Sequence, residues 1–571
     1  MFKLIKYLKG YGAATLCAPL LKLIEAFSEL SVPLVVAYIV DTVIPSGQPR
    51  DVYVWGGILL TLGAGGFMLA LISQYLAARA GVGYGTNLRK AMYAHINRFS
   101  YAEIDRFGTE SLVTRLTGDV RQTRMGVSMF IRLVLRAPFI LIGAIVMAMF
   151  ISIKMSLIFI GVALLIGVAL YFIMSRTGKL YREIRVQLDE VSVLTRENLA
   201  GTRVVRAFSR QEEENTDFSR SAERLAKTSR KAGIIAGLLN PLTYVLINCA
   251  ILLIIWLGGY EVAAGNLTAG QIIALVNYLG QILLALVVFA NLLVTFTKAS
   301  AAARRINEVL STQPSLTYPD AVDALQPVAD APKIRIEGIT FSYPQSAKDD
   351  AHLDGISVSV GAGQSLGIVG ATGSGKTTLI NLIARFYDVS GGAVFIDGHN
   401  VRDYPKAQLA NKIGLVPQAA VLFNGSVREN MLWGKPDATD EEIWDALKTA
   451  QADEFVQKLS KGLDTVIVQG GKNLSGGQRQ RLTIARALIK KPEIVILDDS
   501  SSALDYATDA RLRKALQTDL NNATVLIVSQ RAASVKSANQ ILVLEEGRMI
   551  GLGTHAELLE TCEAYREICS V

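Results

Sequence analysis

Long apolar stretches separated by polar connections fill the N-terminal half of the chain. A helix needs about 20 predominantly apolar residues to cross a bilayer. The stretches that meet this length are Ala13–Ile44, Val54–Ala78, Phe130–Ile153, Ser156–Ser175, Ile235–Leu257 and Gln271–Phe296. The pattern therefore predicts six membrane-spanning helices.

The connections between these stretches alternate between short and long. The long ones, Arg79–Met129 and Arg176–Gly233, are rich in Arg and Lys, whereas the short connection Gly259–Gly270 contains neither. Because Lys and Arg concentrate in cytoplasmic loops, we expect the long connections and both chain ends to lie in the cytoplasm. Both long connections are polar and lack Pro, so we expect the spans to continue into them as helices.

The second half of the chain has a different pattern. A helical segment, Lys298–Leu310, precedes the stretch Thr312–Pro332, whose Pro and Asp residues are typical of a linker. From Lys333 onward, short apolar runs alternate with amphipathic helices, which predicts an α/β domain. Its expected strands include Ile334–Tyr343, Ser365–Val369, Ile494–Leu497 and Thr524–Val528. We therefore expect a membrane domain at 1–310, a linker at 311–332 and a second domain at 333–571.

Composition supports a membrane protein and argues against two other classes. Apolar residues make up 51% of the 571 residues. Lys and Arg, which give the net charge of +8, concentrate beside the apolar runs, so no nucleic-acid partner is expected. The four cysteines show no disulfide framework and no zinc-type spacing. The segment Met1–Lys9 is interpreted as an amphipathic lead-in to a retained first span, because no small-residue cleavage site follows it.

A phosphate-binding motif follows the expected strand Ser365–Val369. The residues from Gly370 to Thr377 match the pattern G-x-x-x-x-G-K-[ST] at the start of a helix. Glycines let backbone N–H groups converge on phosphate oxygens, and the helix N-terminus adds positive potential. We expect Lys376 to reach the β- and γ-phosphates of a nucleotide and Thr377 to bind Mg²⁺. The residues expected at this site are Gly370, Thr372, Gly373, Ser374, Gly375, Lys376, Thr377, Thr378 and, at the end of a later strand, Asp498.

A second motif narrows the class of nucleotide-binding protein. The residues Leu474, Ser475, Gly476, Gly477 and Gln478 form the sequence LSGGQ. Together with the phosphate motif, this signature resembles the ATP-binding cassette (ABC) family, and the resemblance extends over the whole chain. It implies a membrane domain of six transmembrane α-helices with the type I (type IV) ABC exporter fold. An α/β P-loop NTPase cassette that binds ATP and Mg²⁺ should follow.

The resemblance also implies roles for further residues. Tyr343 matches the aromatic residue that stacks on adenine, and Gln418 matches the glutamine that joins Mg²⁺ to the membrane domain. Ser502 and Asp505 match the loop that crosses the interface between two cassettes. In this family two cassettes close head-to-tail, so the signature Leu474–Gln478 should contact ATP held by the partner cassette.

Three positions depart from the family pattern. Asp499 and Gln469 stand where these cassettes have Glu, and Gln530 stands where they have His. A general base must lie within hydrogen-bond reach of the attacking water, and the side chain of Asp499 is one methylene, about 1.5 Å, shorter than that of Glu. Gln530 can hydrogen-bond a γ-phosphate but cannot carry a positive charge as His can. Asp499 and Gln530 are therefore the expected catalytic positions of a site that holds ATP and cleaves it slowly.

Different quaternary structures are consistent with these departures. In a heterodimer, a second half-transporter with Glu and His in place and an altered signature would pair with this chain. Its phosphate loop and the signature of this chain would then form the competent site. In a homodimer, Asp499 and Gln530 would support ordinary hydrolysis. We favour the heterodimer because this chain retains every binding element; a regulatory subunit that only holds ATP is a further hypothesis.

The layout of six spans and one cassette resembles a half-size ABC exporter of the cell membrane. Segments around Ile104–Phe107 and at Glu197–Val205 resemble the coupling helices of this family. No peptidase-like extension precedes the first span, which argues against an exporter that trims peptide cargo. The resemblance implies amphipathic drugs or lipids as cargo, with a lipid or peptide exporter as the alternative. The sequence does not exclude import.

Ionisable residues within the first span are functional candidates, because each charge at the membrane centre costs about 2.5–3.5 kcal/mol. Lys22, Glu25 and Glu29 share one helix face through their spacing. In one interpretation this net negative trio lines a translocation cavity that favours cations. In the other, Lys22 and Glu25 form a structural pair and Glu29 lies near a water-filled interior.

Polar residues within the sixth span also have two alternative roles. Asn277, Gln281 and Asn291 share one face of the sixth span, where they line the pathway or bond to neighbouring helices. We favour the pathway slightly. Arg132 and Arg136 are expected at the cytoplasmic boundary, with their charged ends reaching toward water.

Overall fold

The computed structural model describes residues 2–319, 324–344, 351–500, 504–519 and 522–570. The chain divides into two compact units. The first unit comprises residues 1–97 and 110–311, and the second comprises residues 98–109 and 312–571. The segment 98–109, which lies inside the expected membrane domain, therefore groups with the C-terminal unit.

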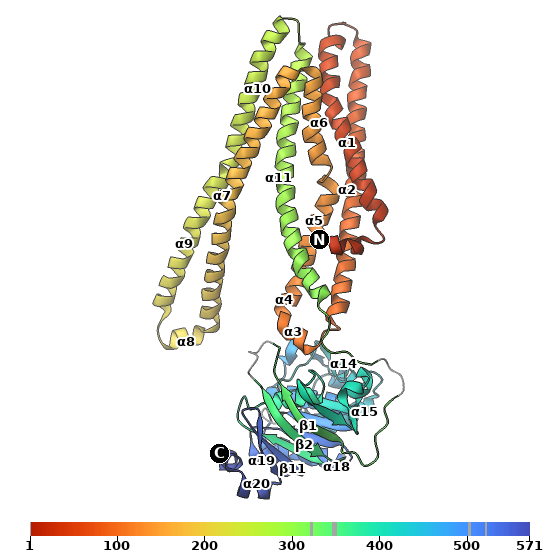
Figure 1. The fold of residues 1–571 in the computed structure, drawn as a ribbon, viewed down its shortest axis with the longest axis vertical. Helices are drawn as coiled ribbons and strands as arrows, with labels where there is room; N and C mark the ends of the chain where they lie inside the picture. The colour runs from red at the N-terminus through yellow and green to blue at the C-terminus, as the bar shows by residue number, and fades with distance from the viewer. Residues whose placement is uncertain (1, 320–323, 345–350, 501–503, 520–521, 571) are drawn as a thin grey trace. The chain divides into compact units, whose positions relative to one another are not determined.

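Long helices make up the first unit (Figure 1). Among the described residues, six helices are long and apolar enough to cross a membrane, which confirms the predicted number of spans. The helices are α1 (Gly12–Tyr38), α2 (Pro49–Ile96), α4 (Thr109–Thr114), α5 (Val120–Leu133), α6 (Arg136–Ile151), α7 (Ile153–Ala200), α8 (Thr202–Ala207), α9 (Gln211–Gly237), α10 (Leu239–Ala263) and α11 (Ala269–Ser311). Shorter elements are the 3-10 helix η1 (Phe2–Leu8) and the π-helices η2 (Ile39–Val43) and η3 (Arg115–Asp119).

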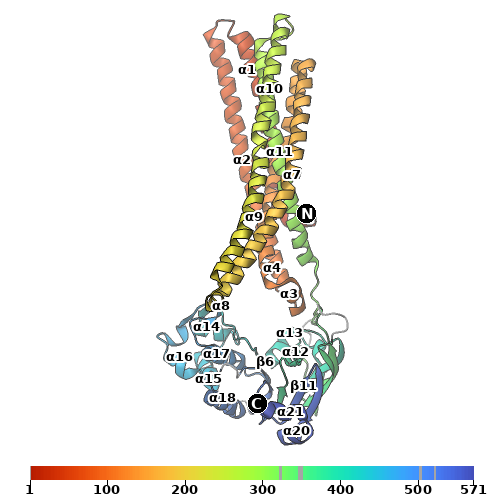
Figure 2. The same cartoon turned by 90° about the vertical axis from the view of Figure 1, so that its left-hand side faces the viewer.

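Several helices continue far beyond their apolar stretches, as predicted. The helices α2 and α7 each span 48 residues. Along its length α7 packs against α10 and α9, and α8 joins α7 to α9 at the tip of this arm (Figure 1 and Figure 2). The second expected coupling segment, Glu197–Val205, covers the end of α7 and the start of α8. The helix expected at Lys298–Leu310 is the last part of α11, which continues without a break to Ser311.

The third span is interrupted, which the apolar pattern does not predict. The helix α5 ends at Leu133, and α6 begins at Arg136 after a turn at Val134 and Leu135. Neither turn residue is Gly or Pro, but Pro138 in the first turn of α6 marks the interruption, because it has no N–H and its ring clashes with the carbonyl of the residue four positions earlier, Val134. The helix α6 ends at Ile151, two residues before the expected end of the span.

Two larger sheets form the core of the second unit. The central sheet has six strands in the order β12-β11-β3-β10-β9-β6, parallel from β11 to β6 and antiparallel at the β12 edge. The other sheet is antiparallel, in the order β2-β1-β4-β5. The strands are β1 (Ile334–Phe341), β2 (Leu353–Val360), β3 (Ser365–Val369), β4 (Gly391–Ile396), β5 (His399–Asn400), β6 (Ile413–Val416), β9 (Ile494–Asp498), β10 (Thr524–Val528), β11 (Gln540–Glu545), β12 (Arg548–Gly553) and a separate pair, β7 (Gly425–Ser426) and β8 (Val466–Ile467). The strands predicted from the sequence are confirmed as β1, β3, β9 and β10.

Helices surround these sheets. They are α3 (Tyr101–Phe107), α12 (Lys376–Ile383), α13 (Lys406–Lys412), α14 (Val427–Leu432), α15 (Asp440–Thr449), α16 (Asp453–Gln457), α17 (Gly476–Leu488), α18 (Tyr506–Asp519), α19 (Ala532–Val535), α20 (His555–Thr561) and α21 (Glu563–Ser570), with the 3-10 helices η4 (Val401–Asp403), η5 (Gly462–Asp464) and η6 (Gln469–Gly471). One apolar core contains the buried aliphatic residues of α12 together with residues of β3, β9, β10 and β11, among them Leu366, Ile368, Ile496 and Leu526. The loop between β3 and α12 is therefore anchored at both ends by this core.

The helix α3 is held in the second unit by aromatic and polar contacts. Tyr101 stacks on Phe386 with ring centroids 4.6 Å apart. Tyr387 O–H donates to the carboxylate of Asp105. The first expected coupling segment, Ile104–Phe107, is the C-terminal part of α3.

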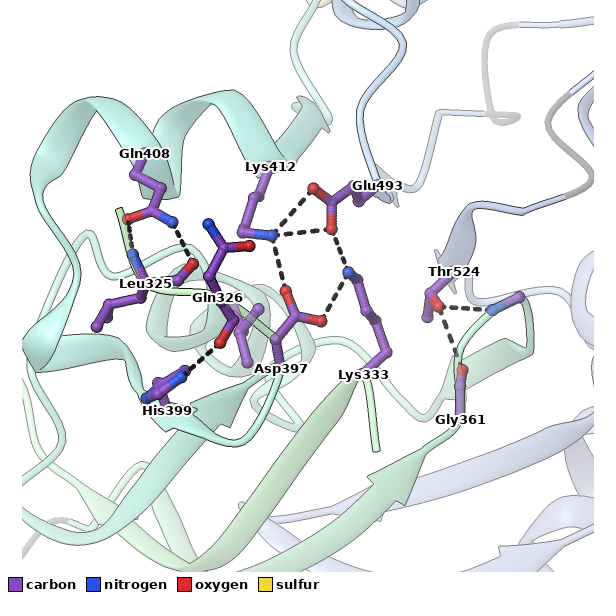
Figure 3. A network of polar contacts seen from close by, with 12 residues as sticks. Leu325, Gln326, Lys333, Gly361, Asp397, His399, Gln408, Lys412, Glu493 and Thr524 are labelled. Atoms are coloured by element: carbon purple, nitrogen blue, oxygen red, sulfur yellow. Dashed lines mark hydrogen bonds and ion pairs between the residues drawn. The ribbon is translucent and has the colours of Figure 1, made fainter. Parts of the chain in front are cut away.

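A charged cluster joins the two sheets of the second unit (Figure 3). Lys412, at the end of α13, lies 2.8 Å from Asp397 and 2.9 Å from Glu493. Lys333 lies 2.7 Å from Asp397 and also pairs with Glu493. Because Asp397 follows β4 and Glu493 precedes β9, the cluster connects the four-stranded sheet to the central sheet.

Candidate nucleotide-binding site

A hollow of about 540 Å³ lies at the carboxyl ends of the parallel strands β3, β9 and β10. Ligands of open α/β sheets bind at this edge, and small-molecule pockets have volumes of about 300–1,000 Å³. The lining residues are Ala351, His352, Thr372, Gly373, Ser374, Gly375, Lys376, Thr377, Thr378, Gln418, Asp498, Asp499, Val528, Gln530, Glu546 and Gly547. The hollow thus gathers most of the phosphate motif and four polar residues at or just after the ends of β6, β9 and β10, namely Gln418, Asp498, Asp499 and Gln530.

The phosphate motif folds as a tight loop before α12. Gly373 and Gly375 adopt positive φ angles of 84° and 96°, a conformation that strongly favours glycine. A Cβ atom at Gly375 would lie 2.5 Å from the side chain of Leu353, so the close approach of these segments also requires glycine. The helix α12 begins at Lys376 and lines the hollow with its first residues. Its unpaired N–H groups suit an anion.

Lys376 lies at the centre of this loop. Its Nζ donates to the carbonyl oxygens of Gly370 (2.8 Å) and Ala371 (2.7 Å). Burial lowers the pKa of the Lys376 ammonium, and the nearby carboxylates of Asp499 and Asp498 oppose that effect. A phosphate group would favour the charged ammonium more strongly than the neutral carbonyls do.

Three oxygen-bearing side chains are suited to Mg²⁺. Thr377 Oγ1 donates to Asp498, at 3.2 Å and 3.4 Å from the two carboxylate oxygens, and Gln418 lines the same hollow. Burial raises the pKa of Asp498, and Asp499 raises it further, whereas Thr377 and Lys376 lower it. Mg²⁺ prefers oxygen ligands and is held by one or two protein groups with substrate phosphates. The residues present therefore fit this ion.

Two of the three positions that depart from the family pattern, Asp499 and Gln530, line the same hollow. Asp499 has a positive φ of 44°, and its N–H donates to the Val528 carbonyl at 3.0 Å. Its carboxylate Oδ2 accepts a hydrogen bond from Gln418 Nε2 at 3.4 Å. Gln530 follows β10 and lines the hollow beside Val528. A left-handed backbone is uncommon outside glycine and marks this position as conformationally constrained.

Tyr343 lies next to the phosphate motif without lining the hollow itself. Its hydroxyl is 3.1 Å from Thr378 Oγ1. Its ring makes an edge-to-face contact with His352, with centroids 5.0 Å apart. Since His352 lines the hollow, Tyr343 and His352 together form an aromatic surface at its border.

The sequence analysis missed His352, Glu546 and Gly547. Gly547 has a φ of 77°, and a Cβ there would lie 2.5 Å from the His352 carbonyl oxygen. Gly547 between two apolar runs is a turn signal. That signal predicts the turn between β11 and β12 but not its position beside the phosphate motif.

The signature caps α17 and does not line the hollow. Ser475 is the N-cap residue: its Oγ accepts from Gln478 N–H (3.3 Å), and its own N–H donates to Gln478 Oε1 (2.9 Å). Such a capping box fixes the start of a helix. Leu474 is buried, whereas a Cβ at Gly476 would meet open space. Gly477 is the second residue of α17.

The remaining predicted positions of the second unit lie elsewhere. Asp505 accepts a hydrogen bond from Thr508 N–H at 3.1 Å near the start of α18. Ser502 lies outside the described residues. Gln469 begins η6, the short helix before the signature.

The charged residues of the first span form a group with Arg136. Lys22 Nζ lies 2.5 Å from Glu25, and Arg136 Nη2 lies 2.7 Å from Glu29. Arg136 Nε is 3.7 Å from Glu25. The expectation that Arg136 reaches toward water is therefore wrong, because α6 places it against the two acids of α1. Two cations and two anions give the group no formal net charge. Arg136 therefore offsets the net negative charge of Lys22, Glu25 and Glu29.

The polar residues of the sixth span have different surroundings. Gln281 Nε2 donates to the Glu29 carbonyl at 3.3 Å and so joins the group on α1. Asn277 donates to Ile273 of its own helix at 2.9 Å. Asn291 is exposed in this chain. Within the described parts of the chain, Gln281 is thus the one of these three that bonds to a neighbouring helix.

Comparisons with known proteins agree over the whole chain. The family described as the ABC transporter transmembrane region matches residues 15–286, and the ABC transporter family matches residues 353–502. An uncharacterised ABC transporter ATP-binding protein of Mycobacterium bovis is 38% identical over 572 residues, covering 99% of this chain and 97% of that protein. The ATP-dependent lipid A-core flippase of Hahella chejuensis is 31% identical over 568 residues, covering 99% and 95%. A bacterial Atm1-family ABC exporter solved with ATP bound has the same fold, with a TM-score of 0.79, 23% identity and 97% of each chain covered.

Proposed function

Because the chain belongs to the ABC transporter family and is a half-size, multi-pass exporter of the cell membrane, we propose that it is the ATP-holding subunit of a heterodimeric exporter. Its own site would bind ATP with Mg²⁺ and cleave it slowly. The site that its signature forms with a different subunit would carry most of the hydrolysis. The observation that carries this proposal is the arrangement of Gln418, Asp499 and Gln530 around an otherwise complete phosphate site.

The binding half of the proposal rests on the phosphate motif. Lys376, Thr377 and Asp498 lie together at one end of the hollow, and the glycine conformations leave the loop N–H groups available to phosphate oxygens. Tyr343 is the residue proposed to stack on adenine. These features support tight binding of ATP and Mg²⁺.

The weak-cleavage half rests on Asp499 and Gln530. A general base contributes roughly 10²–10⁴-fold and must reach the attacking water. The Asp499 side chain is shorter than that of Glu by about 1.5 Å, and its carboxylate accepts a hydrogen bond from Gln418. A misplacement of about 1 Å can cost about 10²-fold in rate. Gln530 supplies an amide where a protonatable imidazole would otherwise add positive charge.

The partner half rests on the signature. Ser475 and Gln478 form a complete capping box, but the signature does not line the hollow of its own cassette. A signature that does not line the hollow of its own cassette can contact only ATP that another cassette holds. The proposed partner is a second half-transporter subunit with Glu and His in place and an altered signature.

The proposed cargo is an amphipathic drug or a lipid. The pairing of Lys22, Glu25 and Glu29 with Arg136 leaves no net charge on this group, which favours amphipathic cargo over simple cations. The flippase name of a relative that is 31% identical supports lipid in particular. A homodimeric lipid exporter is the second candidate, and the flippase name of the same relative supports its lipid cargo.

Counting the ATP molecules that are cleaved in a single turnover tests the proposal. The complex isolated from native membranes through a tag on this chain should cleave one of the two bound ATP molecules rapidly. In the Asp499→Glu, Gln530→His variant both should be cleaved, and the rate at this chain's own site should rise by about 10²-fold. Lys376→Ala serves as the control that removes ATP from this site. Rapid cleavage of both ATP molecules by the unchanged complex would refute the proposal.

A further inference from the structure

A hollow lined by arginines lies between α2 and the segment formed by η3 and α5. Its volume is about 540 Å³, many times the roughly 30 Å³ of one water molecule. Arg89 of α2 lies on one wall, and Arg121 and Arg124 of α5 lie on the other. Gly85 and Gly118 also line this arginine hollow. Where Gly85 lies, the missing side chain leaves room for the stem of Arg124, because a Cβ there would be 3.0 Å from Arg124 Cδ.

No acid neutralises the arginine hollow within the described part of the chain. The α2 side carries none, because the sequence has no Asp or Glu between Asp51 and Glu103. On the other side, Asp119 is bound by Arg305 of α11, with Nε donating at 2.8 Å and Nη2 at 2.5 Å. Among the described residues, no carboxylate forms an ion pair with Arg89, Arg121 or Arg124.

The π-helix η3 explains why the acid and the arginines are separated. A π-turn inserts an extra residue into the helix and is frequent at functional sites. Here it places Thr117 and Gly118 in the arginine hollow, while Asp119 is buried against α11. Arg89 Nε donates to the Leu116 carbonyl at 3.4 Å and so connects α2 to η3. The local fold thus concentrates three positive charges on one concave surface.

From its distance along the chain to the apolar stretch of the third span, we expect the arginine hollow at the depth of the lipid headgroups. Arg124 precedes the apolar stretch that begins at Phe130 by six residues, which corresponds to about 9 Å along a helix. An Arg side chain extends several ångströms toward that boundary. The amphipathic helix η1, which suits a membrane surface, is fixed at the same level, because Asn87 Nδ2 donates to the Tyr7 carbonyl at 3.1 Å. Asn87 lies on α2 between Gly85 and Arg89.

We propose that the arginine hollow binds the phosphate of an anionic bilayer lipid in the cytoplasmic leaflet. Arg guanidinium groups form paired hydrogen bonds with phosphate oxygens, and basic pockets between membrane helices bind lipid headgroups. A bound headgroup would bridge α2 and α5 through Arg89, Arg121 and Arg124. Free phosphate shares this chemistry, but the depth of the hollow favours a lipid. The site is separate from the ATP hollow and does not depend on the proposed asymmetry.

The test compares two pairs of charge removals in the intact transporter. The complex is placed in nanodiscs of phosphatidylcholine, with or without phosphatidylglycerol, and retained lipid is counted by native mass spectrometry. Arg121→Gln with Arg124→Gln should reduce the retained phosphatidylglycerol by about tenfold or more. Arg79→Gln with Lys90→Gln removes the same charge from α2 outside the hollow and should leave retention unchanged. Arg89→Gln alone tests the other wall and covers the case in which the double variant does not fold.

Thermal unfolding in the same nanodiscs distinguishes the sources of phosphate. Phosphatidylglycerol should raise the unfolding temperature of the unchanged protein and of the Arg79, Lys90 control, but not of the Arg121, Arg124 variant. An equal rise produced by inorganic phosphate in phosphatidylcholine nanodiscs would overturn the lipid assignment. Equal lipid loss in the control pair would reduce the effect to general surface charge. Separation of the subunits by Arg121→Gln with Arg124→Gln in either lipid would instead assign these residues to the partner subunit.

Discussion

The side-chain amide of Gln418 donates to Asp499 Oδ2 across 3.4 Å. Gln418 follows β6 and Asp499 follows β9, and these strands pair in parallel. Their side chains therefore emerge at the same edge of the central sheet. The residue proposed to hold Mg²⁺ and the residue proposed to act as a base are thus directly connected.

Substitution of Tyr343 should separate adenine stacking from the contact with the phosphate motif. An aromatic stack contributes about 0.5–1.5 kcal/mol, so Tyr343→Ala should weaken ATP binding by about 2–10-fold. Tyr343→Phe keeps the ring and loses only the hydroxyl that contacts Thr378. It should therefore bind ATP nearly as well as the unchanged protein. Equilibrium binding of a non-hydrolysable ATP analogue measures both variants, and equal losses would argue against stacking.

Removal of Arg136 should destabilise the membrane unit. Arg136→Gln leaves Glu29 without its partner at 2.7 Å and Glu25 without its neighbour at 3.7 Å. The pair is only partly buried, so its loss should cost less than the roughly 3–5 kcal/mol of a fully buried ion pair, and the unfolding temperature of the protein in detergent should still fall. A second change, Glu29→Gln, should restore part of the loss.

Arg132→Gln is the matched control for this prediction. Arg132 lies on α5, before the interruption of the span, and the described chain shows no ion pair for it. Its substitution should change the unfolding temperature little. If the Arg132 and Arg136 variants are equally destabilised, the cause is the apolar surroundings of both residues rather than the ion pair with Glu29.

The charged cluster of the second unit predicts how stability depends on pH. Burial raises the pKa values of Asp397 and Glu493, but hydrogen bonds from Lys333 and Lys412 outweigh it, so both pKa values lie below their ordinary values. Such carboxylates stabilise the fold above their unfolded pKa values of 3.8 and 4.5, and this contribution is lost as the pH falls through the folded values. Burial lowers the pKa of Lys412, but the same two acids raise it overall. Its contribution is present below pH 10.5 and is lost as the pH rises through the folded value.

Lys412→Met tests this cluster. It leaves a buried carboxylate with one partner fewer, which costs about 1–3 kcal/mol, and thermal unfolding at neutral pH should show the loss. Part of the loss should disappear as the pH falls through the folded pKa values of Asp397 and Glu493, which lie below 3.8 and 4.5, because the acids of the unchanged protein then also become protonated. Lys458→Met, at an exposed position, is the control and should leave the pH profile unchanged. An identical pH profile for Lys412→Met and the unchanged protein would contradict the role of the cluster.

Local sequence patterns predict the spans and the phosphate loop. Contacts between residues that lie far apart in the sequence could not be predicted from such patterns. The spans follow from apolar composition, and the loop before Lys376 follows from glycines between a strand and a helix. The contact between Arg136 and Glu29 joins residues 107 positions apart. The periodicity of a single helix does not show which distant helix will pack against its face. Likewise, the position of Gly547 beside His352 depends on how two separate strands meet.

The asymmetry between the two ATP sites is tested most directly by two variants. One disrupts the signature, and the other removes the carboxylate of Asp499. In the complex isolated from native membranes, Ser475→Arg should abolish the site that this chain completes for its partner and lower ATP turnover by about 10²-fold or more. Asp499→Asn should lower turnover by less than about threefold, because this chain's own site contributes little. Equal and large losses in the two variants would show two equivalent sites and would contradict the account.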